Sequence, residues 1–542
     1  MSDLIAQPAP MQLGRLAKLG FWTAAIGVYT YYVFKFFNSL DDDALIPFRY
    51  ALNFLGGHGW GLNPGEHVEG VTSPLHLWLL TLELRYFSPD QAITFLKILG
   101  SLSGIGVLAC VRQIAKIVAP RIEIIGYLAV LFLGLHIHFA LSMINGLETP
   151  LATLFATGGL WLFLREKEAG FRDRVPASAV VLALAALARP ELTLLLPILV
   201  AVSVRGRAFS GYLITFGIPV LAFLIWRISY YGDILPNTYY AKALPPLGGM
   251  VDGIGYLENY GSPFLLPFVF VLPLTLGFGG QALRSHFVEL MVAIFVPIVF
   301  VLLSGGSYMP DGRFLAPAMP FLAILGAAAV YVVATAKLPL GMRAITVGLV
   351  ALLLTIGMAV KFAATEAVFG MAAANEMSTG DPYIGWRCAG PQGRRLMADW
   401  IHKNVPPGAL VATTEMGVPT VLNMDVRFID VRGLSDRTVA RMHRDVGHSN
   451  IGVSLDDWTD FDNELLTYVL RRQPYAIVAF DGGGGSALAN NYRKMAAFTM
   501  PETGWLVTAW LRNDVIPPIR GNIERMSPER ESILGDAGHP GK

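Results

Sequence analysis

Three consecutive carboxylates, Asp41, Asp42 and Asp43, follow the first apolar segment of the chain. A carboxylate can act as a general base that takes the proton from an attacking hydroxyl group, and a second carboxylate beside it raises its pKa. A solvated cap at a helix end is the alternative, because Asp is an ordinary loop residue. The run of three, followed by Arg49 and a glycine-rich stretch, favours chemistry. We therefore predict a catalytic loop at residues 41–72.

The predicted catalytic loop contains other polar side chains that could contact a substrate. Its many glycines, together with Pro64, exclude a continuous helix. Charged groups held beside apolar, membrane-length segments are costly, which favours a functional reason for them. The residues of this loop that we predict to contact a sugar or its acceptor are His58, Asn63, Glu66 and Glu69.

Four basic side chains lie at or near the ends of apolar segments on one predicted side of the membrane. They are Arg49, Arg189, Lys242 and Arg313. An Arg offers two parallel donors to a phosphate and a Lys offers a point charge, so the set is suited to a phosphate leaving group. Contacts with lipid headgroups and structural ion pairs are the alternatives for individual members.

Two carboxylates occupy the starts of apolar segments. Glu148 lies in the sequence NGLETP and Glu191 in ARPE. A carboxylate at a helix start is favoured by the helix dipole, so a cap and a substrate contact stay equal alternatives for both. Arg189 is also close enough in sequence to form a local ion pair with Glu191.

Two further loops combine residue types that suit a sugar phosphate. The loop at 226–243 is rich in tyrosine, and aromatic rings either stack on sugars or mark a membrane interface. An interfacial belt does not explain Asn237 in the same loop. Asp311 lies near Arg313 between glycines, which indicates a tight turn or a phosphate clamp. The predicted sugar or acceptor contacts from these loops are Asn237, Tyr239, Tyr240 and Asp311.

The composition is that of a membrane protein that crosses the bilayer several times. Of the 542 residues 54% are hydrophobic and only 15% are charged, where soluble domains carry about a quarter. A net charge of +1 and the lack of a long basic run give no support for a nucleic-acid partner. The spacing of the two cysteines and of the histidines fits no metal-binding signature, and the glycines fit no dinucleotide-binding signature. We predict no cofactor, with a divalent metal as an open alternative.

Apolar stretches of membrane length predict ten to twelve helices, beginning with residues 20–38. The most basic connections belong in the cytoplasm, which places the catalytic loop on the outer, periplasm-like face. Two full spans between residues 73 and 110 would break this alternation. Either residues 74–88 form a partial element, which their length and charges favour, or the basic connection at 111–121 breaks the charge rule.

The composition changes after residue 364. Residues 1–364 are predicted as the transmembrane domain, residues 365–515 as an outward-facing α/β domain, and residues 516–542 as a disordered tail. Short strands are predicted in the second domain because β-branched and aromatic residues cluster there between turn residues. The predicted strands are 409–415, 426–431, 475–480 and 505–511, and the predicted helices are 391–405 and 462–472.

Several motifs occur together and in order between about residues 40 and 440. After the first helix they are Asp42-Asp43, Phe48-Arg49-Tyr50, Asn63-Pro64-Gly65-Glu66 and Val68-Glu69-Gly70-Val71-Thr72. Later ones are Gly146 to Pro150, Arg189-Pro190-Glu191, Pro236 to Lys242, Arg313-Phe314-Leu315 and Gly433 to Arg437. With these motifs the chain resembles the GT-C superfamily of polyprenyl-phosphate-sugar glycosyltransferases, and within it the AftB-type group of terminal arabinofuranosyltransferases. Departures from the group's pattern occur at Leu45, Val71 and Ser73-Pro74, beside the proposed base.

The resemblance implies an inverting glycosyltransferase with a GT-C fold in the plasma (inner) membrane, in contact with membrane lipids. It would move a sugar, expected to be arabinofuranose, from a polyprenyl-phosphate donor to a cell-envelope glycan. Asp42 is then expected to be the base, with Asp43 as its support or as the second candidate. The alternatives are a GT-C transferase for another sugar with a protein or lipid acceptor, and a lipid or solute transporter without chemistry.

Overall fold

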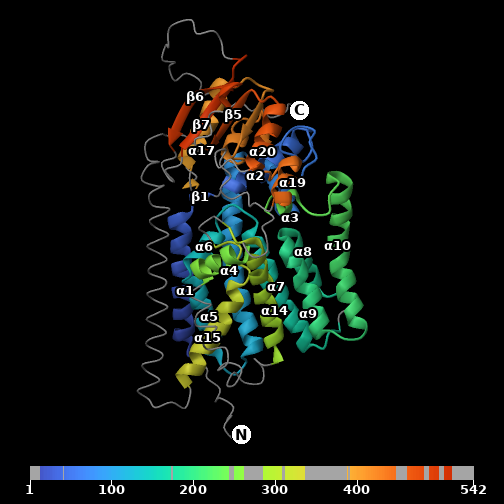
Figure 1. Ribbon diagram of the computed structural model, residues 1–542. Helices are drawn as coiled ribbons and strands as arrows, with labels where there is room; N and C mark the ends of the chain where they lie inside the picture. The colour runs from blue at the N-terminus through green and yellow to red at the C-terminus, as the bar shows by residue number, and fades with distance from the viewer. Residues whose placement is uncertain are drawn as a thin grey trace.

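The computed structural model describes residues 13–40, 42–172, 175–242, 249–261, 285–307, 312–335, 387–388, 391–446, 460–480, 488–499 and 506–515. The structure has a helical part and a sheet-containing part at one end of it (Figure 1). Several predicted features lie outside the described residues. They are the apolar stretches at 263–279 and 344–363, the tail at 516–542, and the side chains of Asp41 and Asp311.

Apolar helices make up the first part of the chain. Their bounds are α1 Arg15–Phe36, α2 Leu45–Leu55, α3 Pro74–Tyr86, α4 Pro89–Val118, α5 Glu123–Gly134, α6 Ile137–Ser142, α7 Thr149–Glu168, α8 Ala177–Ala188, α9 Leu195–Ser203, α10 Arg207–Tyr231, α11 Asn237–Ala241, α14 Phe287–Ser304 and α15 Met319–Thr335. Within the described residues, α4, α10 and α14 are long and apolar enough to cross a membrane. The prediction of an integral membrane protein is confirmed, although several predicted spans are shorter helices.

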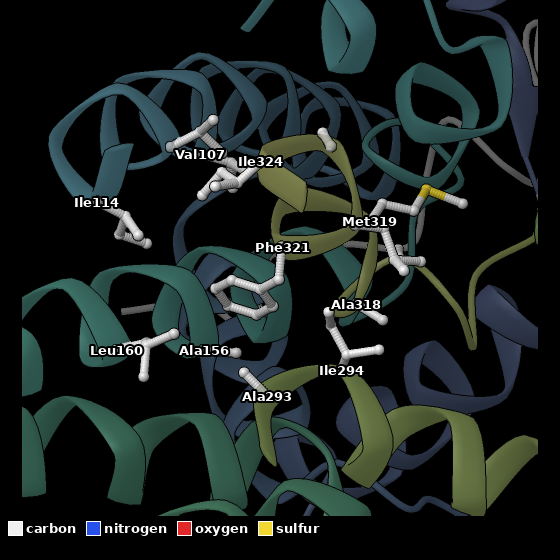
Figure 2. Close-up of a cluster of buried hydrophobic side chains, with 14 of the residues drawn as sticks. Val107, Ile114, Ala156, Leu160, Ala293, Ile294, Ala318, Met319, Phe321 and Ile324 are labelled. Atoms are coloured by element: carbon white, nitrogen blue, oxygen red, sulfur yellow. The ribbon is translucent and has the colours of Figure 1, made fainter. Parts of the chain in front are cut away.

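The core of the helical part consists of small and branched side chains contributed by neighbouring helices. Figure 2 shows Phe321 of α15 among side chains of α4, α7 and α14. Those neighbours include Val107, Ala156, Leu160 and Ala293, all of them almost fully buried. Alanines at these contacts let the helix backbones approach closely, which is how helices associate where lipid provides no hydrophobic drive.

The predicted span at 122–140 is interrupted. Helix α5 ends at Gly134, and His136 then begins the short helix α6 by accepting a hydrogen bond from the backbone N–H of Phe139 at its Nδ1. A side-chain cap of this kind starts a new helix, because it satisfies a donor that has no partner within the helix. The break brings residues 142–148 to the level of the predicted catalytic loop.

Helix α3 bears on the topology problem. It has 13 residues, so it is about 20 Å long, whereas the hydrocarbon core is about 30 Å thick. Ser73 caps it and Pro74 occupies its first turn. This length agrees with the interpretation of 74–88 as a partial element, which leaves α4 as the full span of this region.

The sheet-containing part is built on a five-stranded sheet of order β4-β3-β5-β7-β6. Strands β3, β4 and β5 are parallel, and β7 pairs antiparallel with both β5 and β6. The strands are β3 Leu410–Thr413, β4 Arg427–Asp430, β5 Ala476–Phe480, β6 Tyr492–Thr499 and β7 Leu506–Arg512, and the helices are α17 Pro391–Asn404, α18 Val418–Val421, α19 Arg437–Val446 and α20 Asp460–Arg471. The α/β character and four of the five strands agree with the prediction. Strand β6 and helix α19 were not predicted.

A short parallel pair of strands joins the two parts. Strand β1 Ser39–Leu40 follows α1 and pairs with β2 Arg387–Cys388, which precedes the sheet. The 3-10 turn η2 Asp42–Ala44 comes next, and α2 then lies beneath the sheet domain (Figure 1). The two aspartates are therefore held where the helical part meets the sheet domain.

Candidate active site

Asp43 faces the cationic side chains that the sequence singled out. Its Oδ2 lies 3.1 Å from an Nη2 of Arg313, and its side chain keeps 18% of its surface exposed. Burial opposes ionisation of Asp43, but the charges of Arg313 and Lys242 outweigh it and hold the pKa of this carboxyl below its usual value. Asp43 is thus an ionised carboxylate that remains accessible beside two cations.

Lys242 connects this pair to a second charged group. It follows α11 Asn237–Ala241 and lies close enough to Asp43, Arg313 and Glu148 to feel the charge of each. Burial, together with the neighbouring arginines, holds the pKa of Lys242 below its ordinary value, although the two carboxylates oppose this. The ammonium group therefore depends on nearby anions, and a phosphate would be such an anion.

Arg189, Glu148 and Glu191 form the second charged group. The Nη1 of Arg189 lies 3.2 Å from an Oε1 of Glu148, and its Nε donates to Glu191. The guanidinium also lies over the ring of Phe314, 4.6 Å from its centroid. Both carboxylates are therefore partners of a buried arginine, and Glu148 is the one that lies nearer to Lys242. Five predicted residues, each in a turn or at the end of a helix, converge here: Asp43, Glu148, Arg189, Lys242 and Arg313.

Asp42 points the other way, into the sheet domain. It is 4% exposed, and its two carboxylate oxygens accept hydrogen bonds from the backbone N–H groups of Gly417 and Val418 at 3.2 and 2.9 Å. Burial raises the pKa of Asp42 to about 6, although Arg394 at 3.7 Å opposes the rise. A side chain on residue 417 would meet Asp42, because a Cβ built there comes within 2.3 Å of its carboxyl carbon.

The sheet domain supplies charged residues that the sequence analysis did not select. Glu415 lies at the carboxyl end of β3 and pairs with Arg394 at 2.5 Å and with Arg432 at 2.9 Å. Asp42 joins this network through Arg394. The one sequence signal for Glu415 was its position at the carboxyl end of a predicted strand, because ligand sites of α/β sheets gather there. The pairing of β1 with β2, which brings Arg394 to Asp42, left no sequence signal.

Arg49, predicted to contact a phosphate, donates hydrogen bonds to main-chain carbonyls of the catalytic loop and of the sheet domain. Its Nε donates to the carbonyl of Leu62 at 2.9 Å, and its two Nη atoms donate to carbonyls of Thr420, Asn423 and Val426. The side chain is fully buried. All three guanidinium nitrogens are directed at protein acceptors, which favours a structural role over the predicted contact with a phosphate. Arg49 attaches the catalytic loop to the sheet domain.

Two asparagines serve the same purpose. Asn63 Nδ2 donates to the carbonyl of Phe428 at 2.7 Å, and Phe428 N–H donates back to Asn63 Oδ1 at 2.7 Å. Asn237 donates to the carbonyls of Gly433 and Leu434, at 2.7 and 3.1 Å. Both side chains are buried against main-chain atoms. These contacts favour structural roles over the predicted contacts with sugar.

The remaining predicted contacts pair with other residues or are exposed. Glu69 forms a buried ion pair with Arg227 at 2.8 Å. His58 is exposed, and Glu66 accepts a hydrogen bond from Asn63 at 2.9 Å. The Tyr240 ring lies under the guanidinium of Arg441, 3.4 Å from its centroid, and Tyr239 is 59% exposed. In the part of the chain that the structure describes, no group of three or more His, Cys, Asp or Glu side chains is arranged to hold a metal ion.

Sequence comparisons place this chain beside two curated proteins of one name. A terminal β-(1→2)-arabinofuranosyltransferase of Corynebacterium glutamicum is 29% identical over 330 residues, which are 53% of this chain and 47% of that protein. The protein of the same name from Mycobacterium tuberculosis is 28% identical over 263 residues, which are 44% of this chain and 40% of that protein. This chain is a sequence relative of terminal arabinofuranosyltransferases. The predicted resemblance is confirmed, and the matches span less than half the length of these relatives.

The fold and the sheet domain have matches of their own. The archaeal oligosaccharyltransferase AglB from Archaeoglobus fulgidus, solved with an inhibitory peptide and a dolichol-phosphate, superposes with a TM-score of 0.51 at 10% sequence identity. The superposition covers 93% of this chain and 75% of the AglB chain. The predicted GT-C-type fold is thereby confirmed. Residues 386–515 match a domain of unknown function, DUF8728.

Proposed function

We propose that this chain is an inverting membrane glycosyltransferase that moves a sugar from a polyprenyl phosphate to a cell-envelope glycan. The observation that carries the proposal is the pairing of Asp43 with Arg313 at 3.1 Å beside Lys242. A carboxylate that is accessible and ionised provides a base, and the cations beside it provide binding for the departing phosphate. An inverting displacement needs both functions, because the base removes the proton of the attacking hydroxyl and the cations stabilise the departing phosphate.

The transfer step follows from this geometry. Asp43 accepts the proton of the acceptor hydroxyl while that oxygen forms a bond to the anomeric carbon. The bond from the anomeric carbon to the phosphate oxygen breaks, and its electron pair leaves with the phosphate. Lys242 and Arg313 balance the charge that appears there, and Arg189 is the third cation of the cluster. One displacement inverts the configuration at the anomeric carbon.

Asp42 supports Asp43 in this proposal, which exchanges the roles expected from the sequence. A base must first reach the hydroxyl group, and the value of its pKa matters afterwards. Asp42 is the stronger base of the two, but its oxygens accept backbone hydrogen bonds and it is buried. Its hydrogen bonds to residues 417 and 418 fix the turn that carries Asp43.

The nature of the substrates is inferred from the relatives. Their names specify arabinofuranose as the transferred sugar, and the archaeal structure with the shared fold holds a dolichol-phosphate. We propose a polyprenyl-phosphate arabinofuranose donor and an arabinose-containing acceptor glycan. The acceptor would approach from the extracytoplasmic side, where basic connections and the positive-inside rule put the sheet domain.

The test is a transfer assay with purified protein in detergent or nanodiscs. Wild type is incubated with polyprenyl-phosphoryl arabinofuranose and an arabinan oligosaccharide, and both the extended glycan and the released polyprenyl phosphate are measured by mass spectrometry. Asp43→Asn is the matched inactive control. Consumption of a different polyprenyl sugar would correct the donor. Movement of the lipid across vesicles without release of polyprenyl phosphate would refute the transferase in favour of a transporter.

The orientation is tested separately. A single cysteine introduced at an exposed position of the sheet domain, such as Lys403→Cys, should react in intact cells with a maleimide that does not cross the membrane. A cysteine placed at Arg205, in a basic connection, should react only after the cells are opened. The reverse pattern would overturn the proposed sidedness.

A further inference from the structure

His76 is a buried histidine in the first turn of α3. The residue is only 1% exposed. Neither nitrogen of its imidazole ring has a hydrogen-bond partner among the residues that the structure describes. Its backbone N–H is satisfied, because Ser73 Oγ accepts it at 3.3 Å in the helix cap. The cap fixes the position of the residue, while the imidazole itself is left with two polar atoms to satisfy.

The imidazole lies near the charged cluster of the proposed active site. Glu148 is close enough for its charge to act on His76, and Glu148 in turn lies 3.2 Å from Arg189 and within reach of the charge on Lys242. Helix α3 also packs against α8, the helix that ends at Arg189. His76 therefore lies within reach of Glu148, the carboxylate that pairs with Arg189 and acts on Lys242.

The protonation state of His76 limits what it can bind. Burial holds its pKa below the ordinary value, although the charge of Glu148 opposes this, so the ring is neutral at physiological pH. A neutral imidazole has one N–H donor and one bare nitrogen that accepts. A phosphate oxygen accepts only, and would leave the second nitrogen unsatisfied. A sugar hydroxyl both donates and accepts, so adjacent hydroxyl groups suit the ring.

We infer that His76 binds a hydroxyl group of the sugar that is transferred, and thereby helps to select that sugar. This inference rests on the proposed function. It separates two parts of the donor: Lys242, Arg189 and Arg313 take the phosphate, and His76 together with Glu148 takes the ring hydroxyls. Glu148 contributes an acceptor that a hydroxyl can donate to, which makes a carboxylate and an imidazole adjacent sugar contacts.

The test crosses variants of His76 with donors that each lack one ring hydroxyl. His76→Leu removes both polar nitrogens in a similar volume, and His76→Gln keeps one donor and one acceptor. With the complete donor, His76→Leu should lower kcat/KM by about 10- to 100-fold, and His76→Gln should recover part of this loss. With one of the deoxy donors, wild type and His76→Leu should be equal, because the hydroxyl that distinguishes them is absent.

A core role for His76 would give different results. An equal loss for every donor, with or without each hydroxyl, would overturn the inference, as would a variant with wild-type kinetics. The Tm of His76→Leu without substrate should equal or exceed that of wild type, since leucine leaves no buried polar atom unsatisfied. A marked fall in Tm would assign the imidazole to the core.

Binding measured without turnover distinguishes failure of this inference from failure of the proposed function. The rise in Tm caused by polyprenyl-phosphoryl arabinofuranose is compared in Asp43→Asn and in Asp43→Asn combined with His76→Leu. A smaller rise in the double variant is expected. If wild type consumes the donor but the two rises are equal, only the role of His76 is refuted. If wild type consumes no donor, the proposed transferase function is refuted. Equal rises in Tm for the two variants would then refute the role of His76 as well.

Discussion

The exchange of roles between the two aspartates leads to a quantitative prediction for Asp43→Asn. The amide keeps the size of the side chain and an oxygen that Arg313 can still reach, but it cannot accept the proton. Loss of a general base lowers turnover by about 10²- to 10⁴-fold, which corresponds to about 3–5 kcal/mol of barrier. Removing one negative charge from beside Lys242 and Arg313 leaves the cations more available to the phosphate. The KM for the donor should therefore stay the same or fall.

Asp42→Asn is the comparison that decides between the two residues. The amide oxygen can still accept the N–H of Val418, which lies 2.9 Å from Asp42 Oδ1 in the wild type. We expect about a tenfold loss of turnover or less, because the variant disturbs the position of the turn and leaves the base in place. Initial rates with the polyprenyl-phosphoryl sugar, at several donor concentrations and with saturating acceptor, give kcat and KM separately.

Two results would refute this reasoning. If Asp42→Asn lost more activity than Asp43→Asn, Asp42 would be the base, as expected from the sequence. If Asp43→Asn lost activity only through a higher KM, Asp43 would be a binding residue. A single-turnover measurement with saturating donor keeps product release from hiding the chemical step.

Four further predictions concern the junction and the chemistry. Arg49→Gln leaves buried carbonyls without donors, at a cost of about 1–3 kcal/mol for each unsatisfied group. Limited proteolysis should therefore release the sheet domain from this variant but not from an exposed-site control such as Lys403→Gln. Equal resistance of the two variants would contradict the structural role of Arg49. Gly417→Ala should lower kcat by about 10²-fold, because its Cβ would lie within 2.3 Å of the Asp42 carboxyl carbon, and a wild-type rate would contradict the close packing. The pKa of Asp42 rises from 3.8 to about 6 on folding, so the neutral carboxyl stabilises the fold at low pH and this contribution is lost as pH rises through about 6. The Tm of Asp42→Asn relative to that of wild type should therefore increase between about pH 4 and 7. A decrease would be incompatible with the raised pKa. We also propose that transfer needs no divalent metal, so excess EDTA should change the rate by less than about twofold, and a loss restored by Mg²⁺ or Mn²⁺ would disprove this.

The sequence was sufficient for the membrane class, for the α/β character of the second part and for the cluster around Asp43. Membrane-length apolar stretches and β-rich runs are local signals, so they need no knowledge of tertiary contacts. Arg189, Lys242 and Arg313 could be selected for a related reason: a charge at membrane depth is costly, and its position in an apolar stretch is visible in the sequence.

The roles of Arg49, Asn63 and Asn237 could not be predicted in the same way. Their partners in the sheet domain are main-chain carbonyl and amide groups more than 190 positions away along the chain, and every residue has such groups. No residue type in the partner segment marks the contact. The different surroundings of Asp42 and Asp43 could not be predicted for the same reason. Neighbouring residues in a 3-10 turn point in different directions, and only the docked sheet domain shows which one is covered.

The attachment of the sheet domain has a consequence for how such proteins can change. Arg49, Asn63, Asn237 and Asp42 hold this domain by its main chain, so most side chains of the held segments are free to vary without loosening the attachment. Gly417 is one exception, because a side chain there would meet Asp42. Natural drift or a designed exchange could therefore give the domain a new outer surface, and with it a new acceptor, while the four anchors and one glycine keep it in register with the membrane part.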